Sequence, residues 1–166
     1  MNIHTLMTQF AQFEHAKIGR GPKHPTEPNV SLHTEVNTFL ESYPFLRNDT
    51  GYIDFLECYA GASIFNQNSP FTVDILGFAG NSISTHMFEM EESVIDEEGF
   101  LMFGYLMLDD KSLGQHQISF GFDATHHRLP GVYQYVSQVD AQWDWYCATF
   151  LEWLDKLLHQ CKQFGG

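Results

Sequence analysis

Residues 100–123 read FLMFGYLMLDDKSLGQHQISFGFD, and this segment says more about the fold class than any other part of the chain. The apolar run over 100–108 is typical of a central strand that is covered on both faces. Asp109-Asp110-Lys111-Ser112 has the composition of a hairpin loop. Apolar and small or polar residues then alternate over 118–123, which is the pattern of a second strand. The segment therefore predicts two successive strands joined by a short turn.

Further strands are predicted on both sides of this pair. Residues 71–75 alternate between apolar and polar, and the turn residues Gly77, Gly80 and Asn81 follow them. Pro130-Gly131 is a turn signal that opens a β-rich run over 132–136. Because the strands follow one another through turns and not through helical crossovers, a mostly antiparallel sheet is expected.

Helical periodicity occupies the two ends of the chain. Apolar residues recur at helical spacing over 3–13 and 32–43. Asn48 or Asp49 is expected to cap a third helix, which Gly61 would end. The last helix is predicted over 146–161, with an apolar stripe made of Tyr146, Cys147, Phe150, Leu154, Leu157, Leu158 and Cys161. This order predicts the α+β class, with a mostly antiparallel sheet flanked by helices and a long C-terminal helix.

Charge is the first indication of function. The 166 residues fit one domain, 1–166, and carry a formal net charge of −13. Acidic and basic residues balance over 1–47, so residues 48–166 carry the whole excess. Such a chain repels phosphate backbones and attracts basic proteins, which argues against direct binding of nucleic acid and favours a basic protein partner. The alternative is that the acidity only keeps the protein soluble.

The cysteines and the N-terminus bear on the compartment. Cys58, Cys147 and Cys161 are odd in number, lack CxxC spacing and occupy apolar positions of predicted helices. Buried free thiols in a reducing compartment are therefore expected. No basic residue precedes Lys17, and no apolar run is long enough for a signal peptide or a membrane span, so a cytoplasmic protein is expected.

The common catalytic signatures are missing from the sequence. It contains no GxGxxG, GxxxxGK[ST], GxSxG or HExxH motif, so no catalytic residue and no cofactor are predicted. A small-ligand or metal site would need residues such as Asp123 and His126 to converge from a loop. That alternative is the least favoured, because the adjacent His126 and His127 would point to opposite faces of a strand.

The partner-binding surface is predicted at an acidic segment, 89–98, which holds six carboxylates and no basic residue. The two aspartates of the predicted hairpin loop would extend it if that loop lies nearby. Trp143 is expected on the stripe of the last helix if that helix reaches back to it, whereas Trp145 is either an exposed interface anchor or a residue tucked under a loop. The predicted binding residues are Glu89, Glu91, Glu92, Asp96, Glu97, Glu98, Asp109, Asp110 and Trp145.

Several short motifs occur in an order that resembles the SUKH superfamily, which includes bacterial immunity proteins and the yeast cell-wall assembly regulator. The resemblance covers about 44–160, while 1–30 form an N-terminal helix and loop extension without a counterpart. The segments that carry it are Tyr52-Ile53-Asp54-Phe55-Leu56, Tyr59-Ala60-Gly61-Ala62, Gly99-Phe100-Leu101 with Phe103-Gly104, Ile118-Ser119-Phe120-Gly121-Phe122-Asp123, Gly131-Val132-Tyr133 and Ala148-Thr149-Phe150-Leu151-Glu152-Trp153-Leu154.

This resemblance implies a helix-flanked antiparallel sheet and a non-catalytic intracellular binder, often one that neutralises a toxin. Together with the negative charge, it leads us to expect an immunity protein for a basic toxin domain such as a nuclease. A general regulatory interaction module without a toxin partner is the alternative. The resemblance points to no binding residue, and the oligomeric state stays open.

Overall fold

The β4–β5 hairpin forms the middle of the sheet, as residues 100–123 predict. In the computed structural model, which describes residues 1–19, 30–65, 70–77, 95–110, 114–136 and 140–165, β4 spans Phe100–Asp110 and β5 spans Gly114–Asp123. The two strands are antiparallel, and their register shifts by one residue between Met102 and Gly104. Leu101 and Phe103 share the core face by ordinary alternation, and the bulge brings Leu106, three residues after Phe103, back to that face; all three side chains are fully buried.

Seven strands form one sheet in the order β1 to β7, and every neighbouring pair is antiparallel. The α+β class and the antiparallel sheet are therefore confirmed. The edge strand β1 and its neighbour β2 are short and were not predicted. The remaining strands are β1 Ala16–Ile18, β2 Ala62–Ile64, β3 Phe71–Ile75, β6 Val132–Val136 and β7 Asp140–Cys147.

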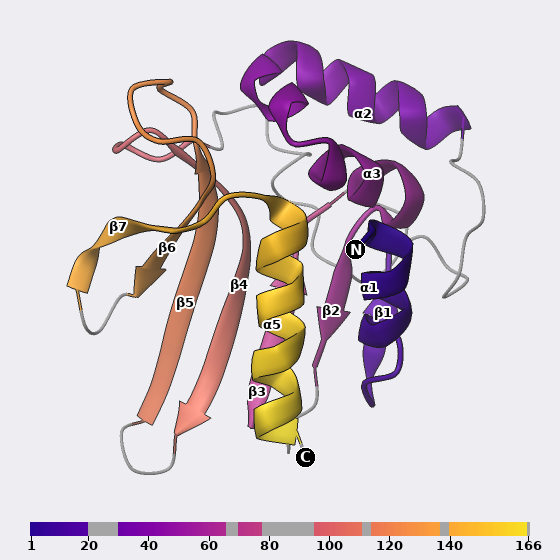
Figure 1. The fold of residues 1–166 in the computed structure, drawn as a ribbon, viewed down its shortest axis with the longest axis vertical. Coiled ribbons are helices and arrows are strands. Elements are labelled where there is room, and N and C mark those ends of the chain that lie inside the picture. Colours follow the sequence, from indigo (N-terminus) through magenta and orange to yellow (C-terminus); the bar gives the residue numbers. More distant parts are fainter. Residues whose placement is uncertain (20–29, 66–69, 78–94, 111–113, 137–139, 166) are drawn as a thin grey trace.

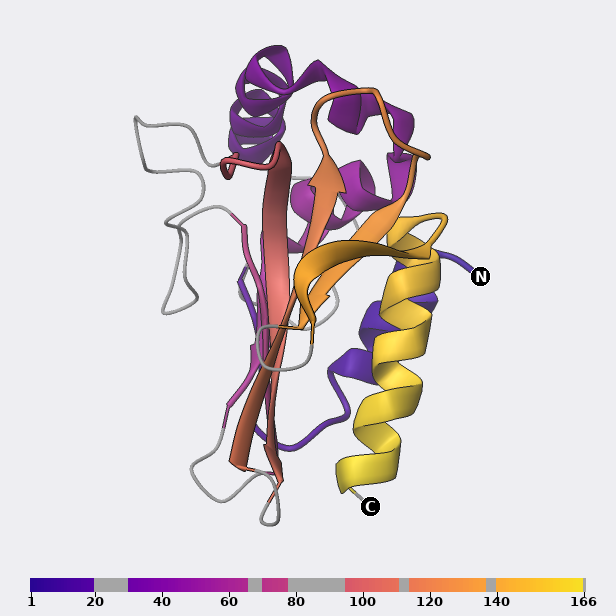
Figure 2. The ribbon, with the colours of Figure 1, turned by 90° about the vertical axis from the view of Figure 1, so that its left-hand side faces the viewer.

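Helices cover one face of this sheet. The long C-terminal helix α5 crosses that face beside α1, and α2 and α3 lie at the upper end of the molecule (Figure 1). Seen edge-on, the sheet has α5 and α1 packed on one side (Figure 2). The helices are α1 Ile3–Phe10, α2 Val30–Ser42, the 3-10 helix η1 Pro44–Asn48, α3 Thr50–Tyr59 and α5 Phe150–Gly165.

An aromatic cluster joins the helices to the sheet. Phe103 from β4 contacts Phe122 from β5 at 4.7 Å between ring centroids and Trp153 from α5 at 4.8 Å. Tyr52 from α3 and Phe150 from α5 complete the cluster at 5.0 Å from Phe122 and 5.6 Å from Phe103. Trp153 is 1% exposed, so it belongs to the centre of the core.

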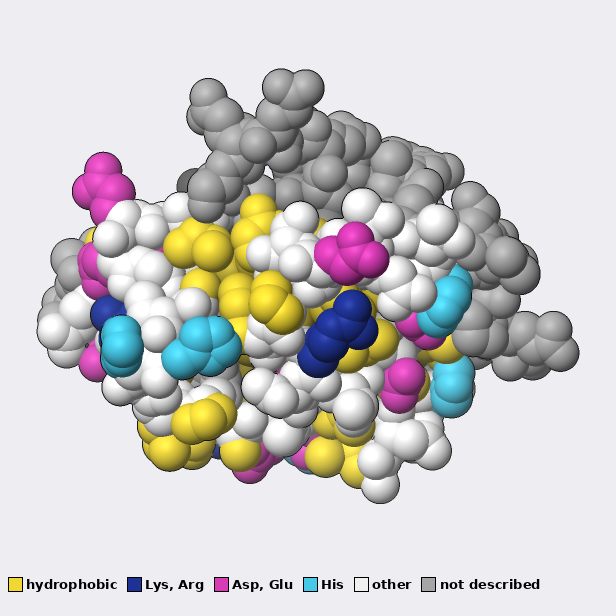
Figure 3. All heavy atoms as spheres, turned by 90° about the horizontal axis from the view of Figure 1, so that it is seen from above, with side chains coloured by type: hydrophobic (Ala, Val, Ile, Leu, Met, Phe, Trp, Pro, Cys, Tyr) yellow, Lys and Arg dark blue, Asp and Glu magenta, His cyan; other side chains and the backbone are white. Residues whose placement is uncertain are grey.

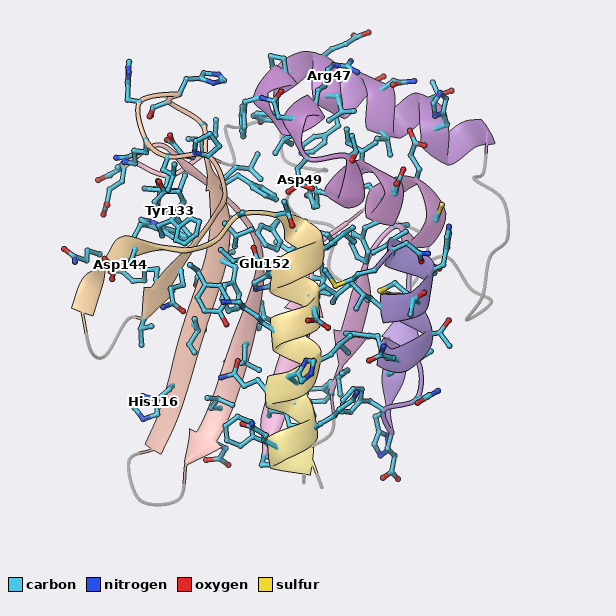
Figure 4. All side chains as sticks on the ribbon, viewed as in Figure 1. Arg47, Asp49, His116, Tyr133, Asp144 and Glu152 are labelled. Carbon is cyan, nitrogen blue, oxygen red and sulfur yellow. The ribbon has the colours of Figure 1, made fainter. Side chains whose placement is uncertain are left out.

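Asp49 ties two helices together at their N-termini. Its carboxylate accepts a hydrogen bond from the Tyr52 backbone N–H at 3.1 Å, which caps α3 as predicted. The second oxygen accepts one from the Phe150 backbone N–H at 2.8 Å, at the start of α5. Figure 4 shows Asp49 directly above that helix. Burial raises the pKa of Asp49 although backbone hydrogen bonds act to lower it, because solvent is largely excluded.

The predicted start of the C-terminal helix was wrong. The helix begins at Phe150, and Tyr146 and Cys147 belong to β7. Trp143 therefore lies on a strand and not on the helix stripe. The physical reason is a variant of the capping box: Thr149 Oγ1 accepts from the Glu152 N–H at 3.1 Å, and the Glu152 carboxylate accepts from the N–H of Ala148, the residue before the cap, at 2.8 Å.

Two further boundaries differ from expectation. Asp109 and Asp110 end β4 and pair with Gln115 and Gly114, so they belong to the strand and not to the hairpin loop. The left-handed residue at the end of α3 is Ala60, with φ 64°, and not Gly61. The Ala60 N–H donates to the Phe55 and Leu56 carbonyls, which holds the residue in this conformation.

The three cysteines are free and buried, as predicted, although Cys147 lies on a strand. Burial raises the pKa of Cys161 to about 12. Burial, with the neighbouring Glu152 carboxylate, raises that of Cys147 to about 12 as well. Thiols with such pKa values stay protonated at neutral pH and are poor nucleophiles.

Candidate protein-binding site

The sheet face opposite the helices is rich in aromatic side chains. Residues directly opposite each other on neighbouring strands share a face, and Tyr133 pairs with Trp145 while Tyr135 pairs with Trp143. The Trp143 ring stacks on Phe100 at 4.7 Å between centroids, with an angle of 21° between the planes. It also meets Tyr135 at 5.5 Å. Phe100 from β4 is buried, and the partly exposed rings of Trp143 and Tyr135 form an aromatic surface over β6 and β7.

Gly121 makes room for the Trp143 ring. A Cβ atom at this position of β5 would lie 3.2 Å from Trp143 Cη2 and 2.8 Å from the Leu101 carbonyl oxygen. The indole therefore rests directly on the backbone of the central hairpin, where a side chain would displace it.

Asp96 holds the indole from the other side. Its Oδ2 accepts a hydrogen bond from Trp143 Nε1 at 2.9 Å. Its Oδ1 accepts from the backbone N–H groups of Glu98 and Phe100 at 3.0 and 2.8 Å. With both oxygens engaged, Asp96 is a structural residue that shapes the turn before β4 and orients Trp143.

Between this turn and the aromatic surface lies a groove of about 550 Å³. Its walls combine apolar, aromatic and acidic side chains. Its lining consists of Ile95, Asp96, Glu97, Glu98, Met102, Ser119, Tyr135 and Trp143, and we call it the acidic-aromatic groove.

Glu97 and Glu98 supply the free negative charge of the groove. Both residues are exposed, and no hydrogen bond or ion pair of their carboxylates occurs within the part of the chain that the structure describes. Their backbone is nevertheless fixed, because the Glu98 carbonyl oxygen accepts a hydrogen bond from Arg128 Nη2 at 3.1 Å. The two charges are thus held on a defined turn, and no described side chain pairs with them.

Arg128 anchors this turn to the neighbouring loop. Its Nη1 donates to Asp123 Oδ1 at 2.9 Å, and its guanidinium carbon lies 4.5 Å from the centroid of the Phe100 ring. Burial raises the pKa of Asp123, but hydrogen bonds from Thr125 and Arg128 outweigh it, so the pKa lies below its ordinary value. Asp123 is therefore an ionised structural partner of Arg128.

The structure brings only part of the predicted binding residues together. Glu89, Glu91 and Glu92 lie outside the described residues. Asp96, Glu97 and Glu98 line the groove. Trp145 follows Trp143 on the same face, is 45% exposed, and donates from Nε1 to the Pro130 carbonyl at 3.2 Å.

Asp109 and Asp110 do not extend this cluster. They lie at the opposite end of β4, roughly 30 Å from its first residue at about 3.3 Å per residue. The condition for the predicted extension, that the hairpin lies near the acidic segment, is not met for Asp96, Glu97 and Glu98, because these three residues adjoin the other end of the same strand. Conversely, Trp143 and Tyr135 were missed as site residues, although the spacing Trp143-x-Trp145 was a strand signal that places two indoles on one face.

A second, smaller cavity of about 180 Å³ lies at the upper end of the molecule. Figure 3 shows this end from above, with hydrophobic side chains gathered in its middle and histidines on either side. The cavity adjoins Asp123 and His126, the residues of the predicted alternative ligand site. Asp123 is engaged with Thr125 and Arg128, and the His126 ring lies edge-on to Phe45 at 6.0 Å. Within the described ranges, no three His, Cys, Asp or Glu side chains group as metal ligands.

No protein-family model, curated protein or solved structure matches this chain. The resemblance to the SUKH superfamily therefore stays a prediction that rests on the motifs quoted above. Among the described residues, no helix has the length and apolar character needed to cross a membrane.

Proposed function

We propose that this protein is a non-catalytic binding module, of the immunity type, that recognises a basic protein through the acidic-aromatic groove. The observation that carries the proposal is the pair of free carboxylates, Glu97 and Glu98, beside the aromatic wall of Trp143 and Tyr135. Aromatic side chains supply contact area at protein interfaces, and the carboxylates supply charge complementarity.

The distribution of charge supports a basic partner. The net charge of −13 attracts a positive protein over a long range and speeds its association. The groove also has the mixed character of an interface, because its apolar residues Ile95 and Met102 adjoin its acidic rim.

The expected partner is a basic toxin domain such as a nuclease. Bound at the groove, this protein would block the toxin sterically, or would place Glu97 and Glu98 where the toxin binds phosphate groups of its substrate. Carboxylates occupy such positions well, since both groups accept hydrogen bonds from Arg and Lys.

The test measures binding to, and inhibition of, any toxin domain encoded beside this gene. The variant Glu97→Gln/Glu98→Gln should weaken binding at least about tenfold and reduce inhibition in parallel, because two charge-assisted contacts are lost. The matched control is Glu41→Gln/Asp54→Asn, which removes two exposed charges from α2 and α3. Equal weakening by both variants would show that only net charge matters and would contradict the groove as the site. Binding without inhibition would instead favour a regulatory module.

A further inference from the structure

We propose that the acidic-aromatic groove binds one arginine side chain of the partner, with its guanidinium against Trp143 and Tyr135 and its charge facing Glu97 and Glu98. This inference deepens the proposed function and depends on it for the identity of the protein that carries the arginine.

The composition of the groove fits a cation. Indole and phenol rings attract cations to their faces, and nearby carboxylates also attract positive charge. The Trp143 and Tyr135 rings meet at 5.5 Å with an angle of 52° between their planes, so they form two adjoining walls and not a flat stack. Within the described part of the chain, no lysine or arginine occupies these two rings.

The protein already binds a guanidinium in this way nearby. Arg128 lies over Phe100 at 4.5 Å and forms an ion pair with Asp123 at 2.9 Å. Phe100 is also the ring on which Trp143 stacks. The groove offers the same combination, with Trp143 as the aromatic ring and Glu97 and Glu98 as the carboxylates. The cation would come from a partner.

Arginine fits better than lysine for two reasons. A planar guanidinium stacks on an aromatic ring, and its several N–H groups can reach both Glu97 and Glu98. The ring is also preorganised, because Asp96 accepts the Trp143 indole N–H and Gly121 leaves the space on which the indole rests. A preorganised wall loses little conformational entropy when the side chain binds.

The experiment titrates the intact protein with three peptides, acetyl-Gly-Gly-Xaa-Gly-Gly-amide, in which Xaa is arginine, lysine or citrulline. Citrulline has nearly the shape of arginine but no charge. Binding is followed by the NMR signals of the tryptophan indole N–H groups. We expect the arginine peptide to shift the Trp143 signal and bind most tightly, lysine to bind more weakly and citrulline not to saturate.

Variants connect the signal to the groove. Trp143→Leu should weaken arginine binding roughly two- to fivefold, whereas Trp143→Phe, which keeps an aromatic face, should retain most of it. Glu97→Gln/Glu98→Gln should weaken it as well, and Glu41→Gln/Asp54→Asn should not. Should Trp143→Leu fail to fold, Tyr135→Leu takes its place. Equal binding of citrulline and arginine, or arginine binding that survives both groove variants, would overturn the inference.

The two proposals fail separately. If the toxin domain loses affinity for the Glu97→Gln/Glu98→Gln variant while the arginine peptide shifts no indole signal, the arginine inference is wrong and the proposed function stands. If the peptide binds at the groove but no adjacent toxin domain binds the protein, the inference about the groove stands and the proposed function is wrong.

Discussion

At the scale of single residues, the turn before β4 and the loop after β5 carry carboxylates with two different roles. Asp96 and Asp123 are structural, since each accepts several hydrogen bonds from its own turn or loop. Glu97 and Glu98 belong to the same turn as Asp96, but no described residue pairs with their carboxylates, so they are the proposed binding groups. The sequence alone does not distinguish the structural carboxylates from the binding ones, because both are Asp or Glu side chains with the same hydrogen-bonding groups.

Asp123 makes the stability of the protein depend on pH in a defined direction. Because its folded pKa lies below the ordinary 3.8, the unfolded chain binds more protons in this region of pH. The contribution is therefore present above the ordinary value and is lost as the pH falls toward the lowered one. We expect Asp123→Asn to reduce the free energy of unfolding by roughly 1 to 3 kcal/mol at neutral pH, and by much less in acid. Denaturant unfolding at several pH values measures this, with Asp109→Asn as the control. A constant difference across the acid range would contradict the assignment.

At the scale of elements, the junction of β7 and α5 decides where the two indoles point. The capping box at Thr149 and Glu152 ends the strand and starts the helix, so Trp143 and Trp145 stay on the sheet. Had the helix begun at residue 146 or earlier, the aromatic wall of the groove would be lost from the sheet face opposite the helices.

Thr149→Ala should therefore lower the free energy of unfolding by about 1 kcal/mol, because the Glu152 N–H loses its acceptor. Thr149→Ser, which keeps the hydroxyl, should restore most of this loss. Thermal unfolding followed by the far-ultraviolet circular dichroism of the helices provides the measurement. If alanine and serine behave alike, the hydroxyl does not cap α5.

At the scale of the whole molecule, negative charge is in excess, and few ion pairs between described residues offset it. Among the described residues, one ion pair joins an arginine to an aspartate, and the other close pairs involve histidine. Repulsion among the remaining carboxylates opposes the folded state, since folding brings them closer together.

Added salt screens this repulsion over a Debye length of about 10 Å at 0.1 M. We expect moderate sodium chloride to raise the Tm of the protein, and expect a smaller rise for Glu97→Gln/Glu98→Gln, which starts with less repulsion. Differential scanning fluorimetry across a salt series measures both. A Tm that falls with salt would show that attractive ion pairs dominate instead.

Much of the fold was predictable because it depends on local patterns. The hairpin of β4 and β5, the strands over 71–75 and 132–136, and the cap at Asp49 all follow from periodicity and turn chemistry within a few residues. The wrong start of the C-terminal helix has a local cause too, because Tyr146, Cys147 and Phe150 continue the helical spacing across the end of β7. The side chains of Thr149 and Glu152 mark the true start of the helix.

The sequence by itself determined the fold class, the net charge and the acidic character of the segment before β4, because these depend on composition and short-range pattern. Only the tertiary structure decided that Asp109 and Asp110 lie far from Asp96, Glu97 and Glu98, and that Trp143 and Tyr135 adjoin these three residues. The reason is that the groove joins residues from 95 to 143 through strand register and through one indole resting on Gly121. Register and long-range packing arise from the whole sheet, and no local pattern specifies them.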